Sequence, residues 1–284
     1  MTAAVSSKSN GAKGKRVQAI KIPDAIRLMT ERYGPFEEEP RLDPAHEAVF
    51  TILSQHTSDI NSSRAFRFLM DRFGSLEAVA RGDEAKIEEA ISPGGLAKVK
   101  APRIKLFLNR VLELNGSLDL SFLREMPLVE AKAWLRQLPG IGPKSAGIIL
   151  NFSLGMPAMA IDTHIYRVCQ RLRFIGPKVT VDKAHEIMEA KVPPEQVFQF
   201  HIAIINHGRR VCKAQRPLCA ECVVAEGCPS RSKIMKAASK KPASAKTNGR
   251  TGPAKTDGPI MPHVPVGQAA AEQAADPDLK DPRQ

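Results

Sequence analysis

Apolar residues recur every three or four positions through the central part of the chain, and two-residue alternation is almost absent. A period near 3.6 places such residues on one face of an α-helix. Glycine, proline and capping residues interrupt the pattern at short intervals. The predicted helices lie between these breaks, at 20–33, 44–53, 65–73, 75–81, 83–91, 96–107, 120–138, 144–152, from 163 onward, 181–188 and 194–208. The pattern therefore predicts an all-α fold.

A tight turn of sequence LPGIGP joins two of these helices. Gly140 and Gly142 can adopt the positive φ angles that other residues resist, and Pro143 suits the first position of the next helix. Backbone N–H groups at such a turn can hold a phosphate. Lys144 follows the turn, and Asp162, eighteen residues later, is placed to cap another helix. The turn alone fits a plain corner between helices as well as a DNA-phosphate clip.

Most of the net charge of +12 lies at the two ends of the chain. Residues 1–16 carry +4 and residues 231–284 carry +5, which leaves +3 for residues 17–230. Binding of nucleic acid by the central part must therefore rest on local basic patches. Two candidate patches are Lys98, Lys100, Arg103 and Lys105, and Arg209, Arg210, Lys213 and Arg216.

No run of eighteen apolar residues occurs, and the N-terminus lacks the apolar stretch of a secretion signal. We therefore expect no membrane association and a cytoplasmic protein, associated with the nucleoid if it is bacterial. Both ends have the composition of flexible segments, which predicts disordered tails over residues 1–16 and 231–284.

Four of the five cysteines cluster as Cys212, Cys219, Cys222 and Cys228, while Cys169 lies apart between apolar positions and is expected in the core. Disulfides are disfavoured because nothing in the sequence indicates secretion. Zinc sites usually contain two short cysteine pairs, whereas only one pair here is separated by two residues. A [4Fe–4S] cluster also requires four thiolates. Spacing rules alone leave both zinc and iron–sulfur open.

The run LPGIGPKSA followed by IDTHIYRV, together with the cysteine spacing, resembles the endonuclease III family of DNA glycosylases over residues 20–230. The resemblance implies a [4Fe–4S] cluster on Cys212, Cys219, Cys222 and Cys228. It also implies a DNA glycosylase and AP lyase of base excision repair, with oxidised pyrimidines as the expected class of damaged base. The implied partner is double-stranded DNA that contains a damaged base or an abasic site.

The same resemblance implies that Lys144 attacks the sugar C1′ of an extruded nucleotide, with Asp162 as its partner carboxylate. The amine must be neutral to react, and we expect burial near the positive end of a helix to lower the pKa of Lys144. The Schiff base then permits β-elimination, which nicks the strand 3′ to the lesion. Monofunctional relatives lack this lysine, so Lys144 favours a bifunctional enzyme. The alternatives are a monofunctional mismatch glycosylase and a non-catalytic helix-hairpin-helix DNA-binding protein.

Further DNA contacts follow from the resemblance. The loop at Gln55 and His56 resembles the segment that fills the gap left by the extruded base, but its spacing leaves open which of the two does so. Leu96 resembles a leucine that wedges between bases. The other DNA-binding candidates are the turn glycines and a lysine beside the cysteines: Gly140, Gly142 and Lys213.

The expected architecture has two helical lobes with the DNA groove between them. A helical barrel over residues 43–156 contains the helix-hairpin-helix. Residues 17–42 join residues 157–230 in the lobe that holds the iron–sulfur cluster. This interleaving is implied by the resemblance, because the sequence itself shows only helices and breaks. We expect a monomer.

Overall fold

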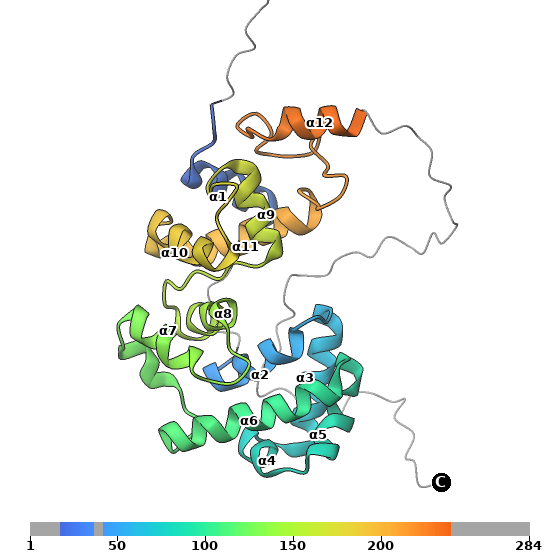
Figure 1. Cartoon of the computed structure of the whole chain (residues 1–284), viewed down its shortest axis with the longest axis vertical. Coiled ribbons are helices and arrows are strands. Elements are labelled where there is room, and N and C mark those ends of the chain that lie inside the picture. Colours follow the sequence, from blue (N-terminus) through green and yellow to red (C-terminus); the bar gives the residue numbers. More distant parts are fainter. Residues whose placement is uncertain (1–17, 37–41, 240–284) are drawn as a thin grey trace, which may run out of the picture.

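The computed structural model describes residues 18–36 and 42–239, and every regular element within these ranges is helical (Figure 1). The α-helices are α1 (Ile22–Tyr33), α2 (Pro44–Ser54), α3 (Asp59–Phe73), α4 (Leu76–Arg81), α5 (Glu84–Ile91), α6 (Ala97–Asn115), α7 (Leu128–Arg136), α8 (Pro143–Leu154), α9 (Thr163–Leu172), α10 (Val181–Lys191), α11 (Val197–Arg210) and α12 (Arg231–Ser239). Short 3₁₀ helices are η1 (Ser92–Gly94), η2 (Ser121–Glu125) and η3 (Pro194–Gln196). The all-α prediction is confirmed.

Local sequence sets where many of these helices begin and end. Short polar side chains at several helix starts accept hydrogen bonds from backbone N–H groups that have no helical partner. These capping residues are Asp43, Ser58, Ser75, Asp83, Asp162 and Thr180. Gly74, Gly116 and Gly155 end α3, α6 and α8 with positive φ angles, which glycine adopts without steric cost.

Two hydrophobic cores divide the helices into two lobes. The first lobe packs helices α2 to α8 around side chains such as Leu53, Phe66 and Phe107. The second packs α1 with α9, α10 and α11 around Met29 and Phe200. In Figure 1 the first lobe lies below and the second above, with α1 beside α9 and α11 although it precedes the first lobe in sequence. The predicted pair of helical lobes is confirmed, whereas the exact domain boundaries stay a prediction.

A small apolar cluster joins the two lobes behind the hairpin. Ile148 and Phe152 of α8 pack with Ala160 and against Phe198 and Ile202, which belong to α11. The ring centroids of Phe152 and Phe198 are 5.3 Å apart. Since α8 follows the LPGIGP turn directly, this contact holds the turn against the second lobe.

The prediction that a disordered tail begins at residue 231 is wrong for the first part of that range. Arg231–Ser239 forms α12, and Ile234 of that helix packs into a small cavity lined by the clustered cysteines. Composition alone does not reveal this contact between the helix and the cysteine loop. The predicted tails at residues 1–16 and 240–284 lie outside the described residues. Within the described ranges, no helix is long and apolar enough to cross a membrane.

Candidate active site

A cavity of about 590 Å³ lies where the two lobes meet. Its walls come from the loop between α2 and α3, from the turn before α8, and from α9, α10 and α11. Six residues predicted from the sequence line it, namely Gln55, His56, Gly140, Gly142, Lys144 and Asp162. Leu96, Lys213 and the four clustered cysteines lie elsewhere. The fold thus brings together residues that are more than 100 positions apart in the sequence.

The turn before α8 uses its two glycines differently. Gly140 has φ 84°, and a Cβ there would lie 2.8 Å from Cδ of Arg103. Gly142 has φ −96°, which other residues also adopt, so only Gly140 of the two uses the positive φ that glycine permits. Pro143 begins α8 as predicted. Gly140 is therefore the position at which this turn requires glycine.

Close packing behind the hairpin positions the segment that leads to Asp162. A Cβ on Gly147 of α8 would lie 2.6 Å from the carbonyl oxygen of Met159. No larger residue fits there without moving the backbone, so Gly147 lets the 159–162 segment approach α8. Sequence reasoning missed this glycine, because a glycine inside a helix carries no local signal of what packs against it.

The two predicted catalytic side chains face the same cavity from different helices. Lys144 is the second residue of α8 and is exposed. Asp162 is half-buried at the start of α9, and its Oδ1 accepts a hydrogen bond of 2.7 Å from the backbone N–H of Ile165. The capping role of Asp162 is confirmed. The expected burial of Lys144 is wrong, because the first turn of α8 opens onto the cleft and leaves this side chain exposed in the part of the chain that the structure describes.

Two buried histidines line the cavity beside this pair, and sequence reasoning missed both. His201 is 2% exposed, and its Nδ1 lies 3.0 Å from the carbonyl oxygen of Ala160, which ties α11 to the segment before Asp162. Burial lowers the pKa of His201 to about 4, against the opposing effect of Asp162. Burial also lowers the pKa of His185. Both imidazoles are therefore neutral near pH 7, and their sequence setting cannot be told from that of ordinary core histidines.

The loop between α2 and α3 presents its two candidate side chains differently. Nε2 of Gln55 donates to the carbonyl oxygen of Gly140 at 3.2 Å, and Oε1 of Gln55 accepts from Nη1 of Arg103 at 2.9 Å. The Gln55 amide is thus engaged at both ends within the protein. His56 has φ 54° and is exposed. Leu96 also has a left-handed φ, of 55°, and is 54% exposed at the start of α6. Such backbone angles in non-glycine residues are concentrated at functional sites.

The predicted basic patch around α6 is wrong for Lys100, while Lys98 is exposed. Lys100 is 2% exposed, and its ammonium donates to the carbonyl oxygens of Leu53 and Gly94 and to the hydroxyl of Thr57. Burial lowers the pKa of Lys100. Instead of contacting phosphates, Lys100 holds the α2–α3 loop against the turn that precedes Leu96. Arg103 and Lys105 also donate to groups inside the protein, which leaves their helix with much less free positive charge than predicted.

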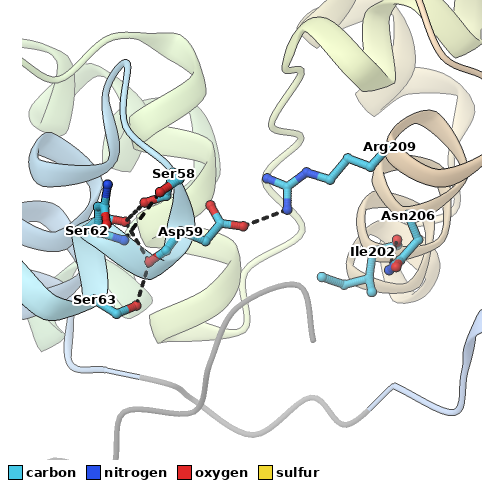
Figure 2. A network of polar contacts seen from close by, with 8 residues as sticks. Ser58, Asp59, Ser62, Ser63, Ile202, Asn206 and Arg209 are labelled. Carbon is cyan, nitrogen blue, oxygen red and sulfur yellow. Dashed lines mark hydrogen bonds and ion pairs between the residues drawn. The ribbon is translucent and has the colours of Figure 1, made fainter. Parts of the chain in front are cut away.

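An ion pair crosses the cleft from one lobe to the other. Nη1 of Arg209 on α11 lies 2.7 Å from Oδ2 of Asp59, the first residue of α3 (Figure 2). Ser58 caps the same helix, and Ser63 donates to the Asp59 carbonyl, so this carboxylate extends from an ordered helix start. Arg209 is therefore paired inside the protein, unlike the exposed Lys213 in the same predicted patch.

The clustered cysteines line one small apolar cavity that follows α11. Cys212, Cys219, Cys222 and Cys228 all face it, and none forms a disulfide. Among the described residues, no group of three or more His, Cys, Asp or Glu side chains could hold a metal ion. Four thiols that line one cavity are the number and type of ligands that a [4Fe–4S] cluster takes. Cys169 is fully buried in α9, as predicted.

Comparison with known proteins agrees with this geometry. Residues 49–194 match the HhH-GPD superfamily of base excision DNA repair proteins, and residues 212–228 match the iron–sulfur binding domain of endonuclease III. A putative DNA glycosylase of Arabidopsis thaliana is 34% identical over 182 residues, which cover 64% of this chain and 61% of the relative. Endonuclease III of Thermotoga maritima is 30% identical over 207 residues, which cover 73% of this chain and 92% of the relative.

The fold also matches a solved structure of a trapped covalent intermediate of endonuclease III with DNA. The TM-score is 0.65 at 25% sequence identity, and the match covers 75% of this chain and 97% of that one. The helical lobes, the hairpin with its lysine, and the cysteine loop thus occur together in a chain whose fold matches nearly the whole length of that structure. This protein is a member of the endonuclease III family of base excision DNA repair proteins.

Proposed function

We propose that this protein acts as a bifunctional DNA glycosylase and AP lyase on double-stranded DNA, with oxidised pyrimidines as its damaged bases, and that it does so as a monomer. The observation that carries the proposal is that Lys144 and Asp162 both line one cavity between the lobes. A cavity of about 590 Å³ has room for an extruded base, since a nucleotide must leave the stack before its glycosidic bond can be reached.

The chemistry assigned to this pair proceeds in two steps. The neutral amine of Lys144 forms a bond to C1′ while the glycosidic bond breaks and the base leaves with its electron pair. The Asp162 carboxylate stabilises the positive charge that develops on the sugar. The C1′–O4′ bond then breaks as the C1′=N bond of the Schiff base forms, and a proton lost by the lysine nitrogen passes to O4′. Loss of a proton from C2′ then expels the 3′ phosphate. Because the protein leaves Lys144 exposed, bound DNA supplies the cover that excludes water.

A comparison of lesions tests the substrate class. Duplexes that contain thymine glycol, an abasic site, or adenine opposite 8-oxoguanine are mixed with the protein and sodium borohydride. We expect covalent complexes on the first two duplexes and none on the third. Adenine release without strand cleavage would show a monofunctional mismatch glycosylase instead. Binding without any product would show a non-catalytic DNA-binding protein.

The structure favours His56 over Gln55 as the side chain that fills the gap in the DNA. His56→Ala should lower excision of thymine glycol about tenfold without a change in Tm, because the imidazole is exposed in the described structure. Gln55→Ala should lower the free energy of unfolding by about 1–3 kcal/mol, since it leaves partners at Gly140 and Arg103 unsatisfied. Single-turnover excision and urea unfolding of both variants measure the two effects. A loss of excision without a loss of stability in Gln55→Ala, and the reverse in His56→Ala, would show that Gln55 fills the gap in the DNA.

The protein carries a [4Fe–4S] cluster, and we propose Cys212, Cys219, Cys222 and Cys228 as its four ligands. The bound cluster supplies iron–sulfur bonds that order this loop and the helices around it. Cys219→Ala should yield colourless protein with a Tm lowered by about 5 °C or more and weaker DNA binding. Cys169→Ala, in the core of the same lobe, is the control and should keep the brown colour. A colourless Cys169 variant or a brown, fully stable Cys219 variant would contradict the ligand assignment.

A further inference from the structure

We propose that Tyr33 and His207 form a directed hydrogen-bond chain that ends on the sulfur of Cys222 and sets the reduction potential of the cluster. Tyr33 is the last residue of α1, and His207 lies near the end of α11. The Tyr33 hydroxyl is 2.9 Å from Nδ1 of His207, and Nε2 of the same ring is 3.6 Å from Sγ of Cys222. This inference rests on the proposed ligation by Cys222.

The direction of each hydrogen bond follows from the chemistry of the end group. A cysteine sulfur that binds iron has no proton, so it can only accept. His207 is 1% exposed, with the Tyr33 hydroxyl at one ring nitrogen and the Cys222 sulfur at the other, and an imidazole with one N–H and one acceptor nitrogen satisfies both contacts. That N–H must be at Nε2 to face the sulfur, which leaves Nδ1 as an acceptor. The Tyr33 hydroxyl must therefore donate to Nδ1.

The surroundings of Tyr33 keep it a donor. Burial raises the pKa of Tyr33 to about 12, so the phenol holds its proton throughout the physiological range. The Arg210 guanidinium carbon lies 5.7 Å from the ring centroid of Tyr33, within the range of a cation–π contact. Because α1 packs along α11, the N-terminal helix supplies the hydroxyl that selects the tautomer of His207. A helix that precedes the first lobe in sequence thus takes part in the hydrogen bonds that reach the cluster ligand in the second lobe.

A second donor reaches the cluster loop from α9. Nη1 of Arg171 lies 3.2 Å from Sγ of Cys212, and the same guanidinium donates to the carbonyl oxygens of Lys213 and Ala214. Hydrogen bonds to ligand sulfurs favour the reduced form of an iron–sulfur cluster, because reduction adds negative charge that the donors stabilise. Removing the Tyr33 hydroxyl lets the His207 proton move to Nδ1. The lone pair of Nε2 would then face the Cys222 sulfur and disfavour reduction.

The test uses the two tyrosines of the chain as a matched pair. Tyr166 lies in the same lobe, but its hydroxyl donates to the carbonyl oxygen of Val179, away from the cysteines. Voltammetry of the full-length, cluster-loaded protein should give a more negative reduction potential for Tyr33→Phe than for wild type, and no change for Tyr166→Phe. Equal potentials for wild type and Tyr33→Phe, or equal shifts in both tyrosine variants, would overturn the inference.

Substitutions at His207 distinguish an effect of the Tyr33–His207–Cys222 hydrogen bonds on the reduction potential from a general effect on folding. His207→Leu removes the donor, so adding Tyr33→Phe to it should produce no further shift. His207→Gln keeps an N–H donor and should retain a potential close to that of wild type. Additive shifts of the reduction potential in the double variant would show that Tyr33 does not act through His207 and would overturn the inference. Wild-type protein that never acquires the iron–sulfur chromophore would instead refute the proposed cysteine ligation.

Discussion

Lys144→Ala should lose covalent trapping and strand cleavage while it keeps its affinity for DNA. The amine is the nucleophile in the proposed reaction, and removal of a nucleophile lowers the rate by about 10³-fold or more. Lys144 is exposed in the first turn of α8, so its truncation should leave Tm unchanged. Borohydride trapping on thymine glycol and abasic-site duplexes measures the loss.

Lys144→Arg separates charge from nucleophilicity. Arginine is a long cationic side chain like lysine, but it stays protonated and cannot attack C1′. We expect the arginine variant to bind DNA as wild type does and to form no covalent complex. Trapping that persists in either variant would show that another amine is the nucleophile and would remove the main support for the proposed mechanism.

Asp162→Asn should lower excision of thymine glycol about 100- to 1,000-fold with little loss of stability. Asparagine caps a helix about as well as aspartate, so the hydrogen bond to the Ile165 N–H is kept while the negative charge beside the reacting sugar is removed. Asp162→Ala removes both functions and should also lower the free energy of unfolding by about 1 kcal/mol.

Single-turnover excision and urea unfolding of these two variants distinguish the roles of Asp162. The catalytic role predicts the same large loss of rate in both, with a difference in stability only. If Asp162→Asn excised thymine glycol at the wild-type rate and only Asp162→Ala were impaired, the carboxylate would be a helix cap and nothing more.

The helices could be predicted, and the cysteine cluster and the proposed catalytic pair could be singled out as candidates, because they rest on local chemistry. Helical periodicity and capping residues act within a few positions of each other, so Asp162 could be recognised as a cap from sequence alone. The four cysteines lie within seventeen consecutive residues, 212–228, and their spacing carries the resemblance to an iron–sulfur loop. The hairpin turn likewise depends on adjacent residues.

The surroundings of these groups depend on contacts between distant segments, which sequence patterns do not contain. Lys100 looks like a surface lysine, yet packing of α6 under two loops buries it and turns its ammonium inward. Gln55 and His56 are neighbours, but only the position of Gly140 and Arg103 shows which side chain is engaged and which is free.

The sequence by itself therefore determined the helical class and the family resemblance and supplied the proposed reactive groups, because these rest on residue types and short spacings. Tertiary structure alone decided that Lys144 is exposed, that Arg209 pairs with Asp59 across the cleft, and that Tyr33 reaches His207 beside Cys222. Burial and hydrogen-bond partners are properties of packed neighbours. In this fold those neighbours come from helices as far apart in sequence as α1 and α11.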